Sequence, residues 1–315
     1  MSRSLLSALT LAALISLTPY PSPGSATAAA QRAAAPAVPA PPPTTTLPKA
    51  EGSIKFLVIG DTGTGSTRQY QVGQQIASAY KQFPFEFAIM LGDNLYGSEG
   101  PSAYVKKFEK PYQPLLDAGV KFYASLGNHD EPAQRFYKPF NMEGKRFYSF
   151  TKGDAEFFVL DSTYMTPAQI DWLERALSAS NKPWKIAYFH HPIYSSGEKH
   201  GSEMDLQALV EPLFLEHGVD VVFAGHEHFY ERLKPQKGIV YVTQGGGAKL
   251  REGNIRASSA MTAKGFDTDQ SFTLVEIVKD EMHLETISRL GRIVDSTVFT
   301  RRDATQPAAS SASLK

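Results

Sequence analysis

Residues 54–63 read IKFLVIGDTG, a mainly apolar run followed by a glycine and then a polar residue. The same arrangement returns at 87–96 (FAIMLGDNLY), 122–130 (FYASLGNHD) and 219–228 (VDVVFAGHEH). Short apolar runs of β-branched and aromatic residues, each followed by glycine, are typical of buried strands that enter a tight turn. Because ligands of α/β sheets bind outside the carboxyl ends of strands, we expect the polar residues after these strands to meet at one edge.

Strand-like runs alternate with helical patterns along the first part of the chain. We expect strands at 54–59, 87–91, 122–126, 157–160, 185–189 and 219–224, and helices at 66–82, 166–180 and 204–217. Further strands at 238–243, 272–279, 282–288 and 292–300 follow without helices, and the glycine-rich segment 245–269 is predicted to be a long loop. This order predicts an α/β fold with two mixed β-sheets sandwiched between helices, in which the later strands form the second sheet.

The N-terminal residues have the composition of an export signal. Arg3 precedes an apolar run from Leu5 to Leu17, and Ala26-Thr27-Ala28 follows as an A-x-A cleavage site. The alternative, a transmembrane anchor, is disfavoured because the run is too short to span a bilayer. We therefore predict a signal peptide at 1–28, a Pro/Ala-rich linker at 29–50, one large domain at 51–301 and a disordered tail at 302–315. The protein is expected to be periplasmic or secreted, without a stable membrane anchor.

Charge balance and cysteine content limit the function further. The chain has 32 Lys and Arg against 32 Asp and Glu and no basic run, which argues against nucleic acid as a partner. It has no cysteine, so any metal site must use oxygen and imidazole ligands. The composition carries no signal of oligomeric state.

The side chains after the predicted strands are metal ligands by type. Six of the eight histidines fall in four short segments, 127–130, 190–192, 200–201 and 225–228. Upstream, Asp61 and Asp93 supply carboxylates, and one carboxylate can bridge two cations. The phenol oxygen of Tyr96 suits a ferric ion. The glycines of 60–66 (GDTGTGS) only faintly imitate a phosphate-binding loop, since no Gly-Lys-Ser/Thr follows them.

Two of the histidine segments divide naturally between ligands and other roles. Neighbouring side chains diverge, so Asn128 suits a metal ligand and His129 a second-sphere proton donor. His226 and His228 are two residues apart, and in extended chain they point to the same side, where each can bind a different metal. Each motif alone is compatible with an ordinary turn. Together they predict a hydrolytic centre with two metal ions.

The ordered motifs resemble those of a known family. Asp-x-Gly at 61–63, Gly-Asp-x-x-Tyr at 92–96, Gly-Asn-His-Asp at 127–130, a histidine after a strand and Gly-His-x-His at 225–228 resemble the purple acid phosphatases. That family, which includes the tartrate-resistant acid phosphatases, belongs to the calcineurin-like metallophosphoesterase superfamily. The resemblance covers Ile54 to about Phe299, and Tyr96 is its most specific residue.

The resemblance implies a role for each site residue. The ferric ligands would be Asp61, Asp93, Tyr96 and His228; the ligands of the divalent ion would be Asp93, Asn128, His190 and His226, with Asp93 bridging. His129 and His200 would contact the phosphate or assist the leaving group. Pro192 favours His190 over His191 as the ligand, and Ala187 stands where the family usually has valine.

The family resemblance also implies an activity. We expect a hydrolase, an acid phosphatase that cleaves phosphate monoesters by direct attack of a metal-bound hydroxide, with Fe³⁺ paired with Fe²⁺, Zn²⁺ or Mn²⁺. Small phosphate esters are the expected substrates, and phosphoproteins and nucleotides remain open. A phosphodiesterase or nucleotide hydrolase on the same scaffold is the main alternative. A non-catalytic exported binding protein is a further one, disfavoured because no ligand is missing.

Overall fold

The computed structural model of the protein describes residues 41–302. The predicted signal peptide, most of the linker and all of the predicted tail except Arg302 lie outside the described residues. Within residues 41–302, no helix has the length and apolar character needed to cross a membrane.

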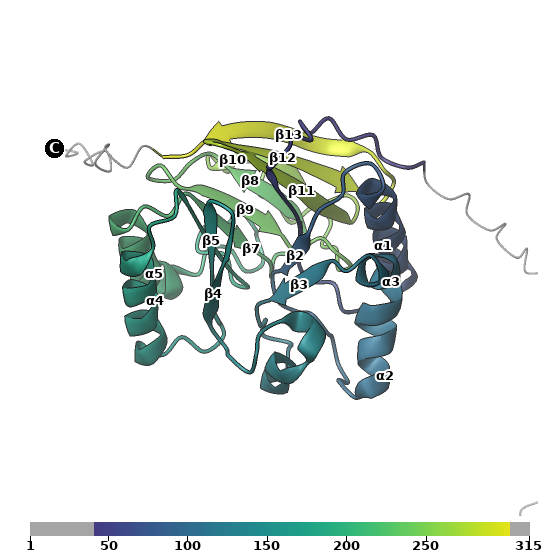
Figure 1. Ribbon diagram of the computed structural model, residues 1–315, viewed down its shortest axis with the longest axis horizontal. Coiled ribbons are helices and arrows are strands. Elements are labelled where there is room, and N and C mark those ends of the chain that lie inside the picture. The colour runs from purple at the N-terminus through teal and green to yellow at the C-terminus, as the bar shows by residue number, and fades with distance from the viewer. Residues whose placement is uncertain (1–40, 303–315) are drawn as a thin grey trace, which may run out of the picture. The chain divides into compact units, whose positions relative to one another are not determined.

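Two β-sheets form the centre of this domain (Figure 1). The first has six strands in the order β13-β12-β11-β1-β2-β3. They are β1 (Ile54–Ile59), β2 (Phe87–Met90), β3 (Lys121–Ala124), β11 (Ser271–Val278), β12 (Glu281–Ser288) and β13 (Ile293–Thr300). Strands β1, β2 and β3 run parallel, whereas β11 to β13 form an antiparallel meander that joins at β1.

The second sheet has seven strands in the order β10-β8-β9-β7-β6-β5-β4. They are β4 (Tyr148–Lys152), β5 (Ala155–Val159), β6 (Trp184–Phe189), β7 (Val221–Ala224), β8 (Tyr230–Leu233), β9 (Val240–Gln244) and β10 (Thr262–Phe266). Strands β5, β6, β7 and β9 are parallel, and β4, β8 and β10 pair antiparallel. Both sheets are therefore mixed, as predicted.

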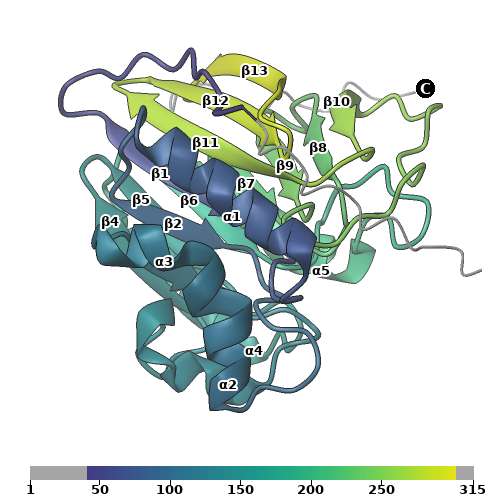
Figure 2. The same ribbon diagram turned by 90° about the vertical axis from the view of Figure 1, so that its right-hand side faces the viewer.

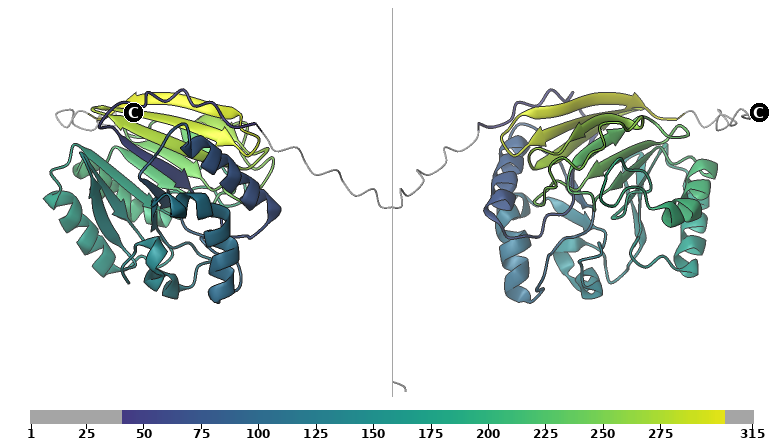
Figure 3. Two further views of the ribbon diagram at one scale, coloured as in Figure 1. Left: turned by 45° about the vertical axis from the view of Figure 1, so that its right-hand side comes forward. Right: turned by 180° about the vertical axis from the view of Figure 1, so that it is seen from behind.

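Helices cover the outer face of each sheet (Figure 2). On the side of β1 to β3 lie α1 (Thr67–Tyr80), α2 (Pro101–Tyr104) and α3 (Lys110–Asp117), with a π-helical turn at Val105–Glu109 between the last two. On the side of the second sheet lie α4 (Pro167–Ala179) and α5 (Met204–Glu216). Two short 3₁₀ turns, Pro132–Phe136 and Lys138–Phe140, lie between β3 and β4 in the chain. The four layers, helix, sheet, sheet and helix, are visible in both views of Figure 3 and confirm the predicted sandwich.

Aromatic side chains fill the space between the two sheets. Phe56 on β1 stacks on Phe87 on β2, with ring centroids 5.2 Å apart. From the facing sheet, Phe157 on β5 and Phe223 on β7 meet Phe56 edge-on at 5.3 and 6.3 Å. These side chains are buried. Burial on both faces explains why the parallel strands are continuous apolar runs instead of alternating patterns.

The membership of the later strands differs from the prediction. Strands β8 to β10 extend the second sheet through β9, which pairs with β7. Strands β11 to β13 join the first sheet, where β11 pairs with β1. The segment 245–269 also contains a strand, β10, which the predicted loop did not include. An apolar run shows that a strand is buried but not which neighbour it pairs with. The sequence pattern therefore could not predict which sheet each later strand joins.

The end of the predicted linker is also different from the expectation. Residues 41–50 have no helix or strand, yet Leu47 belongs to the hydrophobic core. The backbone N–H of Thr46 donates to Glu285 at 3.0 Å, and those of Lys49 and Ala50 donate to Glu276 at 2.7 Å. The ordered domain therefore begins ahead of residue 51, because two buried carboxylates accept hydrogen bonds from this segment.

Candidate metal centre

Sharp turns follow the strands that lead into the site. Asp61 after β1, Asp93 after β2 and His226 after β7 have φ values of 56°, 51° and 67°. Few non-glycine residues adopt this left-handed conformation, and those that do cluster at functional sites. The turns are held together by backbone hydrogen bonds, from Asp61 N to Gly92 O at 3.1 Å and from Gly225 N to His190 O at 2.9 Å.

Two glycines allow these turns to approach each other. A Cβ atom at Gly127 would lie 2.3 Å from both the backbone nitrogen and Oδ1 of Asp93. A Cβ atom at Gly225 would lie 2.7 Å from Oδ2 of Asp61. Neither position has room for a side chain, so the absence of Cβ is what brings the donor atoms of different strands into one cluster.

One group of donor atoms comes from Asp61, Asp93, Tyr96 and His228. The hydroxyl of Tyr96 lies 2.9 Å from Asp61 Oδ1 and 3.4 Å from His228 Nε2. His228 Nε2 lies 3.4 Å from Asp61 Oδ1. Ligand atoms of Asp61, Asp93 and His228 all lie within 4.8 Å of one another. This is the set for which the sequence predicts a ferric ion.

A second group comes from Asn128, His190 and His226. Asn128 Oδ1 lies 2.9 Å from His190 Nε2 and 3.1 Å from His226 Nδ1, and the two ring nitrogens are 3.1 Å apart. Asp93 Oδ1 lies 3.4 Å from His190 Nε2, so Asp93 contacts both groups. Asp93 thus lies between the two groups, at the place where the family resemblance implies a bridging ligand.

The protonation state of the histidines in these groups suits the binding of metal cations. His190 Nδ1 lies 2.9 Å from Leu91 O, which can only accept, so Nδ1 carries the proton and the lone pair of Nε2 faces Asn128 Oδ1. Burial lowers the pKa of His190 well below its usual value, that of His226 to about 2 and that of His228 to about 4. These imidazoles are neutral, as metal ligands must be, and two acceptor atoms face each other where a shared cation would stabilise them.

The carboxylate and phenol groups point to the same conclusion. Burial raises the pKa of Asp61, and the nearby charge of Asp93 raises it further. Burial also raises the pKa of Tyr96, as do the carboxylates of Asp61 and Asp93. Positive charge beside Asp61 and Tyr96 would therefore favour their ionised forms. The donor set, oxygen and imidazole only, fits two metal ions of the iron, zinc and manganese type.

His129 and His200 lie beside the donor groups on exposed loops. The ring of His129 lies 5.0 Å from that of Tyr96, and the backbone N–H of His129 donates to Asp93 Oδ1 at 3.0 Å. The ring of His200 lies 4.3 Å from that of His226. The two predicted proton donors thus flank the two donor groups, one beside each.

The other histidines fall into two kinds. His191 is near the site, with its ring 4.5 Å from that of His226 and its Nδ1 2.9 Å from Ser162 Oγ. Its ligand atom could join those of His190 and His226. His283 lies outside the donor groups and forms an ion pair with Glu281 at 3.2 Å when protonated. His217 ends α5 and is also outside these groups.

Several further side chains near the site were not assigned a role from the sequence. Asp130 is buried and accepts hydrogen bonds from the backbone of Gly127, Asn94 and Leu95, tying two ligand loops together. Lys249 Nζ lies 4.3 Å from the ring centroid of Tyr96. Glu227, between His226 and His228, is also buried, and the sequence pattern carried no signal for any of these three side chains.

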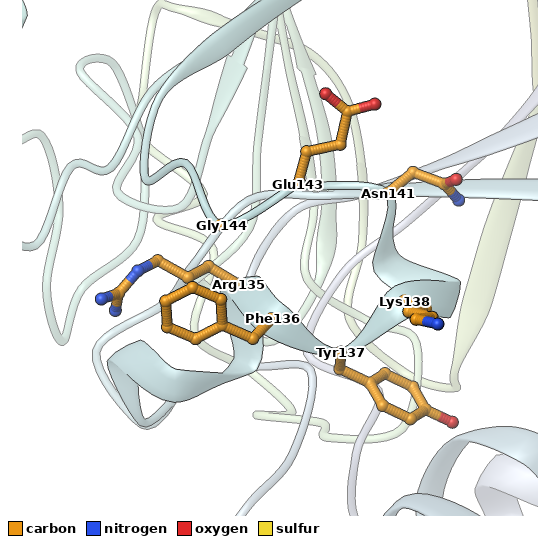
Figure 4. A pocket seen from close by; sticks show the side chains of 7 residues that line it. All are labelled: Arg135, Phe136, Tyr137, Lys138, Asn141, Glu143 and Gly144. Atoms are coloured by element: carbon orange, nitrogen blue, oxygen red, sulfur yellow. The ribbon is translucent and has the colours of Figure 1, made fainter.

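A separate pocket of about 240 Å³ lies on the segment that follows His129 (Figure 4). None of its lining residues is a predicted metal ligand or proton donor. They are Arg135, Phe136, Tyr137, Lys138, Asn141, Glu143 and Gly144. This pocket is therefore separate from the two groups of donor atoms.

Comparison with known proteins identifies the class. The family model described as calcineurin-like phosphoesterase matches residues 54–230, and the chain belongs to this family. Curated relatives include purple acid phosphatase 4 of Arabidopsis thaliana, 29% identical over 274 residues, covering 75% of this chain and 80% of that protein. Tartrate-resistant acid phosphatase type 5 of Oryctolagus cuniculus is 25% identical over 248 residues, covering 64% of this chain and 76% of that protein.

A solved structure supports the fold. The purple acid phosphatase PPD1 from yellow lupin (Lupinus luteus) seeds superimposes with a TM-score of 0.68 at 20% identity, covering 83% of this chain and 55% of that chain. The chain therefore spans only a little over half of the lupin protein. The resemblance to purple acid phosphatases is confirmed, and with it the fold and the class of hydrolases that act on phosphoric esters.

Proposed function

We propose that this protein is an exported acid phosphatase that hydrolyses phosphate monoesters at a centre of two metal ions. The observation that carries the proposal is the position of Asp93, whose carboxylate contacts both donor groups. A single shared carboxylate between two sets of neutral imidazole and oxygen donors is the arrangement expected of a two-metal hydrolase. The relatives named as purple and tartrate-resistant acid phosphatases support the same activity.

The residues divide between the two ions as follows. Asp61, Tyr96 and His228 would hold Fe³⁺, while Asn128, His190 and His226 would hold Fe²⁺, Zn²⁺ or Mn²⁺, and Asp93 would serve both. When bound, the cations would lower the pKa of a water molecule so that it attacks phosphorus directly, and would offset the charge of the phosphate oxygens.

The remaining work would fall to His129 and His200. Both rings are on exposed loops beside the donor groups, within reach of an ester that enters from solvent. Each can donate a hydrogen bond to a phosphate oxygen, and a protonated imidazole can give its proton to the departing alkoxide. Because cleavage proceeds by attack of water, no phosphorylated side chain is required.

The first test is metal analysis with a visible spectrum. We expect iron in the purified protein and an absorption band from charge transfer between the Tyr96 phenolate and Fe³⁺, which Tyr96→Phe removes. Tyr164→Phe is a matched control, because Tyr164 is exposed and its ring lies under Arg146 and not at the donor groups. A colourless, fully active protein without iron would refute the ferric site and leave the phosphoesterase assignment intact.

The second test concerns Asp93. Asp93→Asn removes the negative charge that both cations share, so turnover is expected to fall by about three orders of magnitude or more. Asp117→Asn, on the exposed end of α3 where Asp117 accepts from Gln113, should keep full activity. Retention of activity in a folded Asp93→Asn protein would exclude the two-metal centre.

The main alternative is a phosphodiesterase or nucleotide hydrolase on this scaffold. It predicts a much higher kcat/KM on bis-p-nitrophenyl phosphate than on p-nitrophenyl phosphate, whereas the proposal predicts the reverse. Export is tested separately, by N-terminal sequencing of the mature protein, which should begin after the predicted cleavage site at residues 26–28.

A further inference from the structure

We propose that Glu227 is the positioning residue of His200: its buried carboxylate fixes the peptide bond that follows His200 and so holds the imidazole beside His226. The inference rests on the proposed function, in which His200 serves the leaving group. Glu227 itself lies between two predicted metal ligands in sequence and belongs to neither donor group.

The contacts of Glu227 leave the metal centre and reach two other chain segments. Its side chain is fully buried. Oε1 accepts the backbone N–H of Gly201 at 2.9 Å. Oε2 accepts the side-chain amide of Asn254 at 3.0 Å and faces Arg251 Nη1 at 3.3 Å. Both oxygens therefore have partners, and the two partner sets come from different loops.

The contact with Gly201 is the one that bears on His200. The N–H that Glu227 accepts belongs to the peptide bond between His200 and Gly201, so the carboxylate fixes the peptide plane next to the histidine. Gly201 has a φ of 77°, a conformation that glycine adopts without strain. The backbone on the C-terminal side of His200 is thus held at one point by a charged hydrogen bond, which is stronger than a neutral one.

The loop around His200 is shaped for this contact. A Cβ atom at Gly197 would lie 2.1 Å from Glu227 Oε1, so the loop backbone passes directly over the carboxylate. The backbone N–H of Glu198 donates to Asn254 O at 2.8 Å, and Gly197 pairs with Ile255 in a β-bridge. The His200 loop and the segment 254–255 therefore form one layer, and Glu227 lies beneath it and bonds to both.

Arg251 links this layer back to the donor groups. Its backbone N–H donates to His228 O at 3.0 Å while its guanidinium faces Glu227. The carboxylate of Glu227 is thus connected to the loop that carries His200 and, through Arg251, to the ligand loop that carries His228. We infer that this network sets the place of the His200 ring relative to the two metal ions.

The consequence concerns bond cleavage. As the oxygen of water bonds to phosphorus, the ester P–O bond breaks and its electron pair stays on the alkoxide. A protonated His200 gives its proton to that oxygen, so that an alcohol leaves and a neutral imidazole remains. An alkyl alkoxide needs this proton, whereas p-nitrophenolate is stable without it. Displacement of His200 should therefore slow alkyl esters far more than nitrophenyl esters.

The test is Glu227→Gln, assayed on p-nitrophenyl phosphate and on an alkyl ester such as 2-phenylethyl phosphate. Glutamine has one acceptor oxygen, so either Gly201 or the Arg251–Asn254 pair loses its partner. We expect kcat/KM on the alkyl ester to fall about ten- to a hundredfold and that on the nitrophenyl ester less than about threefold. Metal content should equal that of the unmodified protein.

Two further proteins make the result decisive. His200→Asn should show the same dependence on the leaving group. Glu276→Gln is the matched control, since Glu276 is equally buried and accepts backbone N–H groups, but from the N-terminal segment. It should leave the ratio of the two rates unchanged. Where Glu227→Gln does not fold, Asn254→Ala, which removes one partner of the carboxylate, should shift the ratio in the same direction.

Three outcomes overturn the inference. The first is a leaving-group dependence in His200→Asn that Glu227→Gln, or Asn254→Ala in its place, lacks. The second is loss of metal from Glu227→Gln with an unchanged ratio, which would make Glu227 only a support for its histidine neighbours. The third is no dependence in His200→Asn, which removes the function being positioned. In all three, the proposed activity still stands if the unmodified protein hydrolyses both monoesters.

Discussion

At the scale of single residues, the site depends on the orientation of each side chain more than on residue type. His190 and His191 are adjacent and chemically identical, yet their surroundings differ. His190 Nδ1 lies against Leu91 O, which turns Nε2 toward Asn128 and Asp93. The Nδ1 of His191 lies instead against Ser162 Oγ. In both rings the contact at Nδ1 leaves Nε2 for a metal, and the Nε2 of His190 lies 2.9 Å from Asn128 Oδ1 and 3.4 Å from Asp93 Oδ1.

This difference gives a direct prediction. His190→Ala should lose about half of the bound metal and most of the activity, because the divalent ion loses an imidazole and a contact to Asp93 disappears. His191→Ala should keep both ions, because the alignment on Pro192 makes His190 the ligand. Metal stoichiometry of the purified variants, with kcat on p-nitrophenyl phosphate, measures both effects. The assignment from Pro192 would be wrong if the two variants gave the opposite result.

The residue types and their order were enough to predict which donor side chains gather, but not which residues support them. Asp61, Asn128 and His226 follow predicted strands, and the turns after those strands do meet at one edge. Glu227 and Lys249 were not predicted to act there, because what they contact depends on loops from other parts of the chain. The sequence shows which donor residues are present, but not which residues of distant loops they contact.

At the scale of elements, strands buried on both faces were the predictable part. The runs at β1, β2, β5, β6 and β7 are almost wholly buried and were found within a few residues of their ends. Strand β10 was missed because it lies at a sheet edge and none of its residues, TAKGF, is fully buried. Helix α1 was predicted within a few residues of its ends, and Ser66 caps it by accepting from Gln69 N at 3.4 Å.

The entrance to β7 carries a pH-dependent contribution to stability. Asp220 accepts the backbone N–H of Lys185 on β6 and that of Arg302, both at 3.0 Å. Burial raises its pKa from 3.8 to about 6. Because the folded pKa lies above the unfolded one, the carboxyl group stabilises the fold when protonated, and this contribution is lost as the pH rises from about 4 to about 6.

Asp220→Asn should remove that dependence. The free energy of unfolding of the variant, relative to the unmodified protein, should rise by about 2 kcal/mol between about pH 4.5 and about pH 7.5. Urea denaturation across this range measures it. Other buried carboxyl groups such as Asp130 titrate in both proteins and cancel in the difference. A difference that stays constant with pH would contradict the shift assigned to Asp220.

At the scale of the whole molecule, composition failed to predict where the ordered domain begins. Residues 41–50 are rich in proline and threonine, a composition typical of linkers. Their contacts come from the backbone N–H groups that they present to Glu276 and Glu285, and these carboxylates are buried on β11 and β12. Every residue except proline carries a backbone N–H, so composition could not reveal that Thr46, Lys49 and Ala50 donate here.

The last prediction follows from those contacts. A protein that begins at residue 51 should unfold with a free energy about 2–4 kcal/mol lower than one that begins at residue 41, since it loses the burial of Leu47 and the donors to two carboxylates. Urea denaturation of the two truncated proteins measures this. Glu285→Gln in the longer protein isolates the hydrogen bonds and should lower stability by a smaller amount. Equal stability of the two truncations would mean that residues 41–50 are a linker after all, as their composition suggests, and that the domain begins at residue 51.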